Sequence, residues 1–328
     1  MLKVRFSVMA VILLSFGFSS CENEVHINAP WKETIVVYGL LNPNDSVQYI
    51  KINKAFLNEN ISALTAAKTS DSLYLDSVNV RLICAATGQN ILLKRTNEKL
   101  KDSGLFANNV NYLWKTHEPI YENQEYVLEV ENPISKNKAT ARTVTIGKAK
   151  IAAPFMNVNA QYSFGVEYLV VNFKTGLNSN AYDVKFLVDY EEMNTDDTAN
   201  TKKTRQIVWN IIRNAPVKPM SNYIYQVERT ALLQFLANTI PASPKLLHRV
   251  KSVGIRIYGG NQALMDYISV NEPSIGIIQK QAEYSNITNW YGLFASRSSQ
   301  EIWPVKIDPS SIYVLQTNPI TKALNFIR

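Results

Sequence analysis

Cysteine, histidine and glycine are all scarce in this sequence. The 328 residues include two cysteines, three histidines and twelve glycines. A zinc site made of two cysteine pairs needs four cysteines and is therefore excluded. No glycine-rich phosphate loop, no Gly-x-Ser-x-Gly elbow and no His-Glu-x-x-His helix occurs. The sequence thus predicts no cofactor, no metal site and no catalytic residues, and we expect a non-enzymatic protein.

Clustered positive charge is also missing. The chain has 34 Lys and Arg against 27 Asp and Glu, and no basic run is longer than Lys202-Lys203. Lys3 and Arg5 belong to the N-terminal leader described next, so the remainder carries 32 against 27, a net charge of +5. A surface that follows a nucleic-acid backbone needs clustered cations. Nucleic acid is therefore a disfavoured partner.

The N-terminus has the pattern of an export signal. Lys3 and Arg5 precede an almost purely apolar stretch, residues 6–18. A stretch of about a dozen residues suits a signal peptide, because a membrane-spanning helix needs roughly twenty. The end of this stretch, Phe18-Ser19-Ser20-Cys21, resembles the bacterial lipobox, in which cleavage occurs before a lipid-bearing cysteine. The alternatives are an ordinary signal peptide and an uncleaved anchor.

The resemblance implies that Cys21 carries acyl chains and holds the protein at a membrane, since two or more chains give stable anchoring. Glu22 and Glu24 resemble the acidic signal that directs many Bacteroidetes lipoproteins to the outer face of the outer membrane. We therefore expect a lipid-anchored outer-membrane protein that faces the cell exterior. With Cys21 lipidated, Cys84 has no disulfide partner, and its strand-like surroundings indicate a buried apolar residue.

The first half of the mature chain is rich in β-branched and aromatic residues that partly alternate with polar ones. The first two of these segments are separated by Asn42-Pro43-Asn44-Asp45 and predict a hairpin. An alanine-rich interval, residues 60–68, predicts a short helix or an ordered loop. This spacing is typical of an immunoglobulin-like β-sandwich, although the Cys–Trp–Cys core of a true immunoglobulin domain is absent. The predicted strands cover residues 34–41, 46–53, 78–85, 91–94, 124–131 and 139–146.

The second half predicts another β-rich domain with one or two short helices. Its strands are expected at residues 167–173, 182–190, 206–212 and 250–258, with a long hairpin around residues 191–205. Residues 228–238 read as a helix, 262–270 as helix or strand, and the chain after 289 as short β-like pieces. The predicted organisation is a signal peptide at 1–20, a lipidated tether at 21–32, a β-sandwich domain at 33–148 and a second β-rich domain at 149–328.

Aromatic residues are the best candidates for ligand or partner contact. Tryptophan and tyrosine serve for stacking on sugars and for gripping protein partners, and they also fill cores. Two clusters stand out, Trp290-Tyr291 and Tyr223-Ile224-Tyr225. Ligand contact and core packing both remain open for Trp290, Tyr291, Tyr223 and Tyr225.

Other polar groups give weaker signals. His117 and His248 are interpreted as ordinary surface or satisfied residues. An acidic stretch lacks the spacing and the glycine of a calcium-binding EF-hand loop and is interpreted as a solvated hairpin tip. A carboxylate pair for glycoside cleavage remains open, because such pairs meet only in space. The acidic stretch comprises Asp189, Glu191, Glu192, Asp196 and Asp197.

Four tripeptides resemble the Asp-Ser/Thr-apolar sequence on which Bacteroidetes attach O-glycans to exported proteins. We expect modification of at least one of their hydroxyl residues. The four hydroxyl residues are Ser46, Ser72, Ser77 and Thr198.

The segment 284–296, Tyr-Ser-Asn-Ile-Thr-Asn-Trp-Tyr-Gly-Leu-Phe-Ala-Ser, resembles the Ser-Asn-Ile…Gly-Leu/Ile-Phe signature of a Bacteroidetes outer-membrane lipoprotein family of unknown function. The opening segment, residues 35–55, is similar to the start of that family in position and character. Where the family often has paired glycines before Gly292, this chain has Trp290-Tyr291. Members are commonly encoded beside TonB-dependent receptors, so the resemblance implies an accessory of uptake.

The sequence therefore predicts a non-enzymatic surface lipoprotein that binds a glycan or peptide ligand, or the TonB-dependent receptor itself. One alternative is a structural or adhesive component of a surface assembly. Another is a glycan- or peptide-processing enzyme. An open cleft lined with aromatic residues would favour uptake, whereas an unpaired edge strand or a flat apolar face would favour assembly.

Overall fold

The computed structural model describes residues 34–55, 63–75, 77–102, 104, 106–107, 109–154, 161–197, 201–272 and 283–328. The predicted signal peptide, the tether with Cys21, and Thr198 lie outside the described residues. No helix among the residues that are described is long and apolar enough to cross a membrane.

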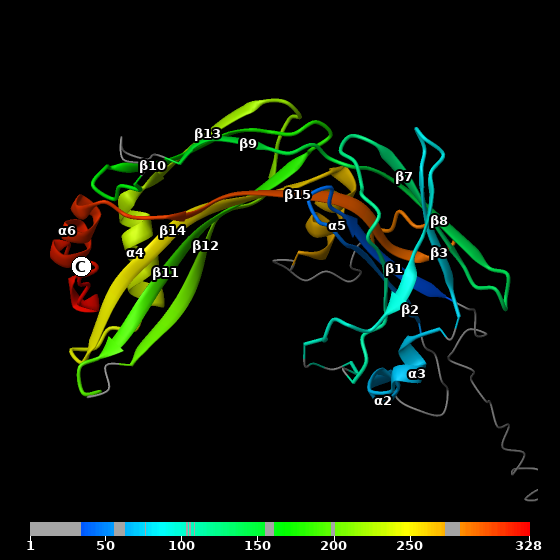
Figure 1. Ribbon diagram of the computed structural model, residues 1–328, viewed down its shortest axis with the longest axis horizontal. Helices are drawn as coiled ribbons and strands as arrows, with labels where there is room; N and C mark the ends of the chain where they lie inside the picture. The colour runs from blue at the N-terminus through cyan, green and yellow to red at the C-terminus, as the bar shows by residue number, and fades with distance from the viewer. Residues whose placement is uncertain are drawn as a thin grey trace, which may run out of the picture.

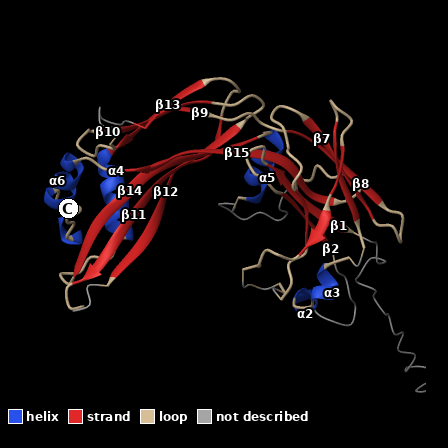
Figure 2. Ribbon diagram, viewed as in Figure 1, coloured by secondary structure: helices blue, strands red, loops and turns tan. Residues whose placement is uncertain are grey.

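The protein is mainly β, with a few short helices (Figures 1 and 2). The strands are β1 (Ile35–Leu41), β2 (Gln48–Lys54), β3 (Asn79–Cys84), β4 (Asn90–Leu92), β5 (Lys94–Thr96), β6 (Leu113–Thr116), β7 (Glu125–Glu131), β8 (Lys138–Val144), β9 (Lys150–Pro154), β10 (Tyr168–Lys174), β11 (Ala181–Asn194), β12 (Lys202–Pro216), β13 (Asn222–Glu228), β14 (Leu246–Gly260) and β15 (Tyr291–Val305). The helices are α2 (Ala63–Ala67), α3 (Ser70–Leu73), α4 (Arg229–Thr239), α5 (Gln262–Asn271), α6 (Pro309–Thr317) and the 3-10 helix η2 (Lys322–Leu324).

One long sheet connects the whole molecule. Its eight strands follow the order β12-β11-β14-β15-β1-β2-β6-β5, and all neighbours are antiparallel except the parallel pair β1 and β15. Two smaller sheets, β4-β3-β7-β8 and β13-β10-β9, complete the β structure. The predicted β1–β2 hairpin is confirmed by its antiparallel register.

The first hydrophobic core lies between β4-β3-β7-β8 and the β15-β1-β2-β6 part of the long sheet. Alternate residues of each strand point inward, as a half-buried strand requires. Ile35 and Val37 of β1 thus face Leu128 and Val130 of β7, and all four are buried. Two packed sheets around one core form the immunoglobulin-like β-sandwich that the sequence predicts.

The second core lies between the β12-β11-β14-β15 part of the long sheet and the sheet β13-β10-β9. Helix α4 closes this core with Leu232, Leu233 and Leu236, all buried. Phe235 of the same helix stacks on Trp209 of β12, with ring centroids 5.6 Å apart. The predicted helix at 228–238 is therefore confirmed, and its apolar face packs on the sheet.

Strand β15 belongs to both sandwiches. Its first half pairs with β1 and its second half with β14, so it runs across an arch from one sandwich to the other (Figure 1). Ile287, Trp290 and Phe294 consequently belong to the core of the first sandwich, although they lie late in the sequence. The division into domains at 33–148 and 149–328 stays a prediction, and this packing adds residues 287–294 to the first core.

The expectation of short β-like pieces after residue 289 is wrong. A single fifteen-residue strand occupies Tyr291–Val305, and α6 and η2 follow it. Helix α6 begins where Asp308 accepts a hydrogen bond from the Ser311 amide at 2.8 Å, with Pro309 at its first position. The ambiguous segment 262–270 is a helix, α5. The stretch between residues 94 and 124, for which the sequence predicts no strand, contains β5 and β6.

Candidate functional site

The aromatic residues singled out from the sequence are mostly core residues. Trp290 lies in the core of the first sandwich with 7% of its surface exposed, whereas the adjacent Tyr291 is 53% exposed. Tyr223 and Tyr225 of β13 point toward the second core, where both stack on Phe173 at centroid distances of 6.2 and 6.0 Å. Of these four residues, Tyr291 alone presents a largely open surface.

The predicted glycosylation residues lie in different places. Ser46 is exposed in the turn between β1 and β2, and Ser77 is exposed just before β3. Ser72 lies within α3. The structure brings none of the three together with another.

The acidic stretch of the β11–β12 hairpin is only partly a solvated tip. Glu191 and Glu192 lie within β11, nearly buried, and form ion pairs with basic neighbours rather than facing open solvent. Glu192 pairs with Arg205 at 3.1 Å and Glu191 with Lys251 at 3.1 Å. Among the described residues there is no group of three or more His, Cys, Asp or Glu side chains that could hold a metal ion.

His248 is a core residue and not a surface one. It is fully buried, and its Nδ1 lies 2.5 Å from the carbonyl oxygen of Leu324. Backbone hydrogen bonds with Asn325 and Ile327 hold the C-terminal segment on β14 at the same point. His117, by contrast, is exposed.

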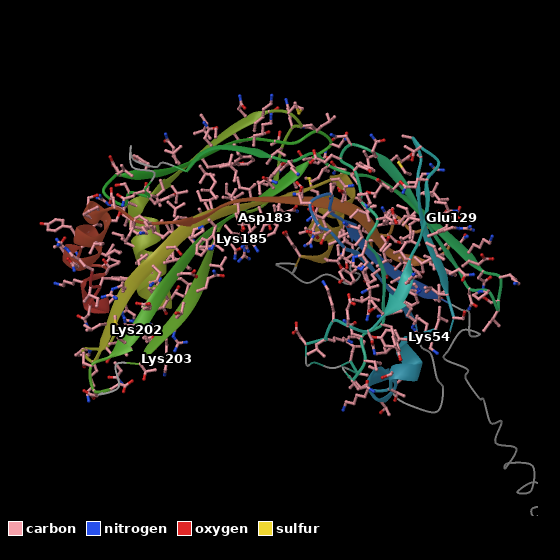
Figure 3. All side chains as sticks on the ribbon, viewed as in Figure 1. Lys54, Glu129, Asp183, Lys185, Lys202 and Lys203 are labelled. Carbon is pink, nitrogen blue, oxygen red and sulfur yellow. The ribbon has the colours of Figure 1, made fainter. Side chains whose placement is uncertain are left out.

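The long sheet has one face that neither core covers, which we call the outer face. It carries the alternate residues that point away from the cores, such as Asp183 and Lys185 of β11, and it forms the concave side of the arch. Figure 3 labels both residues there, whereas Glu129 lies on the convex side of the first sandwich. Strand registers place Lys185 opposite Arg256 and Asp183 opposite Tyr258, so these four side chains share the face.

Three adjoining hollows on the outer face form a groove across the junction of the two sandwiches. The central hollow has a volume of about 360 Å³ and shares Leu40 and Arg297 with a hollow of about 650 Å³ over the first sandwich. It shares Tyr258 with a third of about 420 Å³ over the second sandwich. We call the three together the junction groove.

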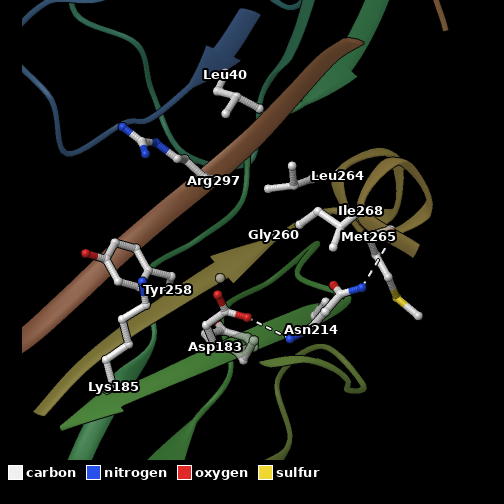
Figure 4. A pocket seen from close by; sticks show the side chains of 13 residues that line it. Leu40, Asp183, Lys185, Asn214, Tyr258, Gly260, Leu264, Met265, Ile268 and Arg297 are labelled. Atoms are coloured by element: carbon white, nitrogen blue, oxygen red, sulfur yellow. Dashed lines mark hydrogen bonds between the residues drawn. The ribbon is translucent and has the colours of Figure 1, made fainter. Parts of the chain in front are cut away.

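The central hollow combines polar and apolar walls (Figure 4). Asp183, Lys185 and Tyr258 stand on the sheet, and the Lys185 ammonium lies 5.0 Å from the centre of the Tyr258 ring. Gly260 lies beneath α5, where a Cβ atom built on it would lie 3.0 Å from Leu264 Cδ2. The opposite wall consists of apolar side chains from β1 and α5, namely Leu40, Leu264, Met265 and Ile268.

Helix α5 is held over the groove at both ends. Asn261 caps its N-terminus by accepting from the Leu264 amide, while its Nδ2 donates to Thr143 Oγ1 of β8 at 2.8 Å. Near the other end, Asn214 Nδ2 donates to Ser269 Oγ at 3.1 Å. The backbone N–H of Asn214 donates to Asp183 Oδ1 at 2.6 Å, and this hydrogen bond fixes the carboxylate in the hollow.

The large hollow contains an ion pair and a cation over a ring. Arg297 and Asp45 approach to 3.6 Å, and the Lys99 ammonium lies 3.8 Å from the centre of the Tyr49 ring. The Tyr49 hydroxyl donates to Glu98 at 2.7 Å, and this hydrogen bond raises the pKa of Tyr49. Lys115 and then Tyr49 bind the Glu98 carboxylate and lower its pKa to about 2. These aromatic and charged groups are therefore positioned by one another.

In the third hollow, Arg256 pairs with Glu301 at 2.7 Å. The pKa of Arg256 is raised by its contact with the Tyr258 hydroxyl and then by that with Glu301. The groove thus offers hydrogen-bonding groups of both signs beside aromatic and apolar surface, which is the usual chemistry of a small-molecule or oligomer binding site.

The sequence did not single out any residue of the junction groove apart from Ser46. The lining residues come from seven strands, a helix and the loops between them, and they form no local motif. Only the strand registers bring them together, so no signal in the sequence alone could have found them.

Comparisons with known proteins give little help. No protein-family model matches the chain, and no curated protein matches it. The C-terminal globular domain of an oligosaccharyltransferase from Pyrococcus abyssi aligns with 69% of this chain and 46% of its own length, at 9% identity and a TM-score of 0.22. CBD12 from CALX1.2 aligns with 83% of this chain and 99% of its own, at 10% identity and a TM-score of 0.18. The alignment spans about half of the first structure, and both scores are too low to support an argument.

Proposed function

We propose that this chain is a surface lipoprotein that acts as a non-enzymatic accessory of TonB-dependent uptake and binds a ligand in the junction groove. Cys21 anchors it to the outer membrane, and Glu22 and Glu24 direct it to the exterior. The β body then presents its concave side to molecules that pass toward a receptor.

The observation that carries this proposal is the position of the groove. Strands of both sandwiches and helix α5 contribute to it, and it combines apolar side chains, tyrosine rings and charged groups of both signs. Clefts at the boundary between two structural units are preferred binding sites. The predicted N-terminal export signal and the family resemblance of residues 284–296 support a location at the outer membrane.

An affinity pull-down from the native outer membrane tests the uptake role. The tagged, lipidated protein is extracted in mild detergent and its partners are identified by mass spectrometry. Stoichiometric recovery of a TonB-dependent receptor supports the proposal. Recovery of the protein alone, or with surface structural proteins only, refutes it.

Variants of the groove test the binding role. Tyr258→Ala removes a ring that lines two of the hollows. Tyr168→Ala is the matched control, since Tyr168 lies on β10, away from the groove, with 41% of its surface exposed. We expect uptake of the receptor's substrate to fall in cells with Tyr258→Ala and to be unchanged with Tyr168→Ala. Equal uptake in both would argue against the groove as the binding site.

A second candidate function, a structural subunit of a surface assembly, is favoured by β12. This fifteen-residue strand is at the edge of the long sheet and pairs only with β11 among the described strands. Open edges can pair with strands of other chains. Cross-linking in intact cells distinguishes the two roles, because an assembly subunit would link through β12 to structural proteins and not to a receptor.

A further inference from the structure

Two lysines of the junction groove differ from the cations on the other exposed sheet face, and from Arg256 and Arg297 of the groove itself, which pair with carboxylates. On the outward face of β3, β7 and β8, the cations pair with carboxylates, such as Arg81 with Glu129 at 2.8 Å and Arg142 with Glu125 at 3.4 Å. In the groove, Lys185 and Lys99 lie over tyrosine rings instead and form no ion pair with any carboxylate that the structure describes. An anionic ligand would therefore find two ammonium groups that are not already neutralised.

A carboxylate shares the central hollow with Lys185, whereas Lys99 lies in the large hollow. Asp183 uses Oδ1 to accept from the Asn214 amide, and Oδ2 has no hydrogen-bond partner among the residues that the structure describes. A ligand that carried only negative charge would be repelled here. A ligand with hydroxyl donors beside its negative groups would satisfy both Asp183 and Lys185, because carboxylates are strong acceptors of hydroxyl hydrogen bonds.

The central hollow suits a ring that has an apolar face and polar edges. Tyr258 and the apolar side chains of Leu264 and Met265 line this hollow together with Asp183 and Lys185. A sugar ring bound there contacts the tyrosine ring and the apolar side chains through its C–H groups. Its hydroxyl groups then reach Asp183 and Lys185.

The groove follows the face of the sheet and not its edge. The backbone N–H and C=O groups of β11, β14 and β15 are paired with neighbouring strands. A peptide in the groove could therefore add no strand to the sheet, and recognition has to come from side chains. The three hollows adjoin one another across several strands, so the groove accepts a chain of rings rather than one ring.

We infer that the ligand of the junction groove is an acidic oligosaccharide, whose hydroxyl groups bind Asp183 and whose carboxylate or sulfate groups bind Lys185 and Lys99. This inference rests on the proposed function, since it names the ligand class for the same groove.

Titration of the full lipidated protein in detergent micelles with defined oligosaccharides tests the inference. The probes are oligogalacturonate as the acidic chain, laminari-oligosaccharide of equal length as the neutral chain, and polyglutamate as a polyanion without hydroxyl groups. We expect the protein to bind oligogalacturonate, and to bind it more weakly as salt rises, because salt screens exposed charges. Comparable affinity for laminari-oligosaccharide or polyglutamate would overturn the inference.

Asp183→Asn separates an acidic sugar from a simple polyanion. The substitution keeps an acceptor for the Asn214 amide and removes one negative charge. For an acidic sugar, we expect affinity to fall about tenfold, since a hydrogen bond to a charged group is lost. For a simple polyanion, affinity would rise because repulsion is removed, and this result would overturn the inference.

Lys185→Gln is expected to weaken oligogalacturonate binding at least fivefold, whereas Arg142→Gln on β8 serves as the matched control and should leave it unchanged. If the protein binds the neutral laminari-oligosaccharide, and Asp183→Asn and Lys185→Gln both abolish this binding, the inference of an acidic ligand is refuted. The proposed binding function of the groove would remain intact. Oligogalacturonate binding together with no receptor in the pull-down would refute the uptake role and leave this inference standing.

Discussion

A side chain on Gly292 would collide with the carbonyl oxygen of Val37. A Cβ atom built on Gly292 lies 1.9 Å from that oxygen, and the residue has φ of +122°, a conformation available almost only to glycine. The two residues are register partners in the parallel pair of β1 and β15. The glycine of the Trp-Tyr-Gly-Leu-Phe segment therefore lets β15 join the first sandwich.

Gly292→Ala is expected to lower the free energy of unfolding by about 3 kcal/mol or more, because it combines backbone strain with a steric clash. Gly88→Ala is the matched control: Gly88 has φ of +68°, and a Cβ atom built on it meets no other atom within 4 Å. This control should cost only about 1 kcal/mol, the strain of a left-handed residue. Urea unfolding followed by circular dichroism measures both, and equal losses would show that the close approach to Val37 has no effect.

Most of the fold could be predicted from the sequence because most strands alternate. Strand β7, with Tyr126, Leu128 and Val130 buried and glutamates between them, is a clear example. Strand β15 could not be recognised, since buried serines interrupt its apolar pattern. Ser296 is fully buried because its Oγ accepts from the Ile146 amide and donates to the Leu41 carbonyl, where the two sandwiches meet. A buried polar residue whose hydrogen-bond partners come from distant parts of the chain is interpreted from the sequence as a loop residue.

The candidate site could not be predicted from the sequence, for a different reason. The cations Lys99, Lys185 and Arg297 are far apart in a sequence with no basic run longer than two residues. Lys185 of β11 and Arg297 of β15 line the central hollow, and Arg297 lines the large hollow together with Lys99. Charge that is spread along the chain therefore gathers in one groove. The aromatic pairs visible in the sequence gave a different result, because Trp290 precedes β15 and packs into the first core, whereas Tyr291 begins the strand and faces outward. Trp290 is therefore buried while Tyr291 is exposed.

Lys51 makes the stability depend on pH. Its ammonium is half-buried and donates to the Tyr74 hydroxyl at 2.9 Å and to Asn111 Oδ1 at 2.5 Å. Burial, and then the nearby charge of Lys101, lowers the pKa of Lys51 to about 8 from 10.5. Between these two values the unfolded chain keeps the proton that the folded chain has lost, so the free energy of unfolding rises with pH.

We expect this rise to be on the order of 1 kcal/mol between pH 7 and pH 9.5, because solvent screens a half-exposed group. Lys51→Met removes the titrating group. The difference in stability between wild type and variant should therefore change by that amount across the interval, whatever its value at pH 7. Urea unfolding at both pH values measures it, and a constant difference would contradict the prediction.

Cys21→Ala tests the predicted anchor, which lies outside the described residues. Metabolic labelling with radioactive palmitate should label the wild type and leave the variant unlabelled, because the thiol is the proposed site of acylation. The variant should also leave the membrane fraction, since a protein without acyl chains lacks its anchor. Cys84→Ala is the matched control, because Cys84 is buried. Labelling of the Cys21→Ala variant would refute lipidation at this residue.

Asn261 contributes both to the stability of the protein and to the shape of the junction groove. It caps α5 and donates to Thr143 of β8, so it fixes the helix whose side chains Leu264 and Met265 line the central hollow. Asn261→Ala should lower the free energy of unfolding by about 2 kcal/mol, one for the cap and one for the hydrogen bond. Because α5 then loses its attachment to the first sandwich, ligand affinity should fall at least fivefold.

Asp308→Ala separates these two effects. Asp308 caps α6 in the same way, through the Ser311 amide, but α6 does not line the groove. We expect a loss of stability similar to that of Asn261→Ala and an unchanged affinity for the groove ligand. Thermal unfolding and titration of both variants at a temperature well below unfolding give the comparison. If both variants lose affinity equally, general destabilisation explains the loss and α5 does not shape the site.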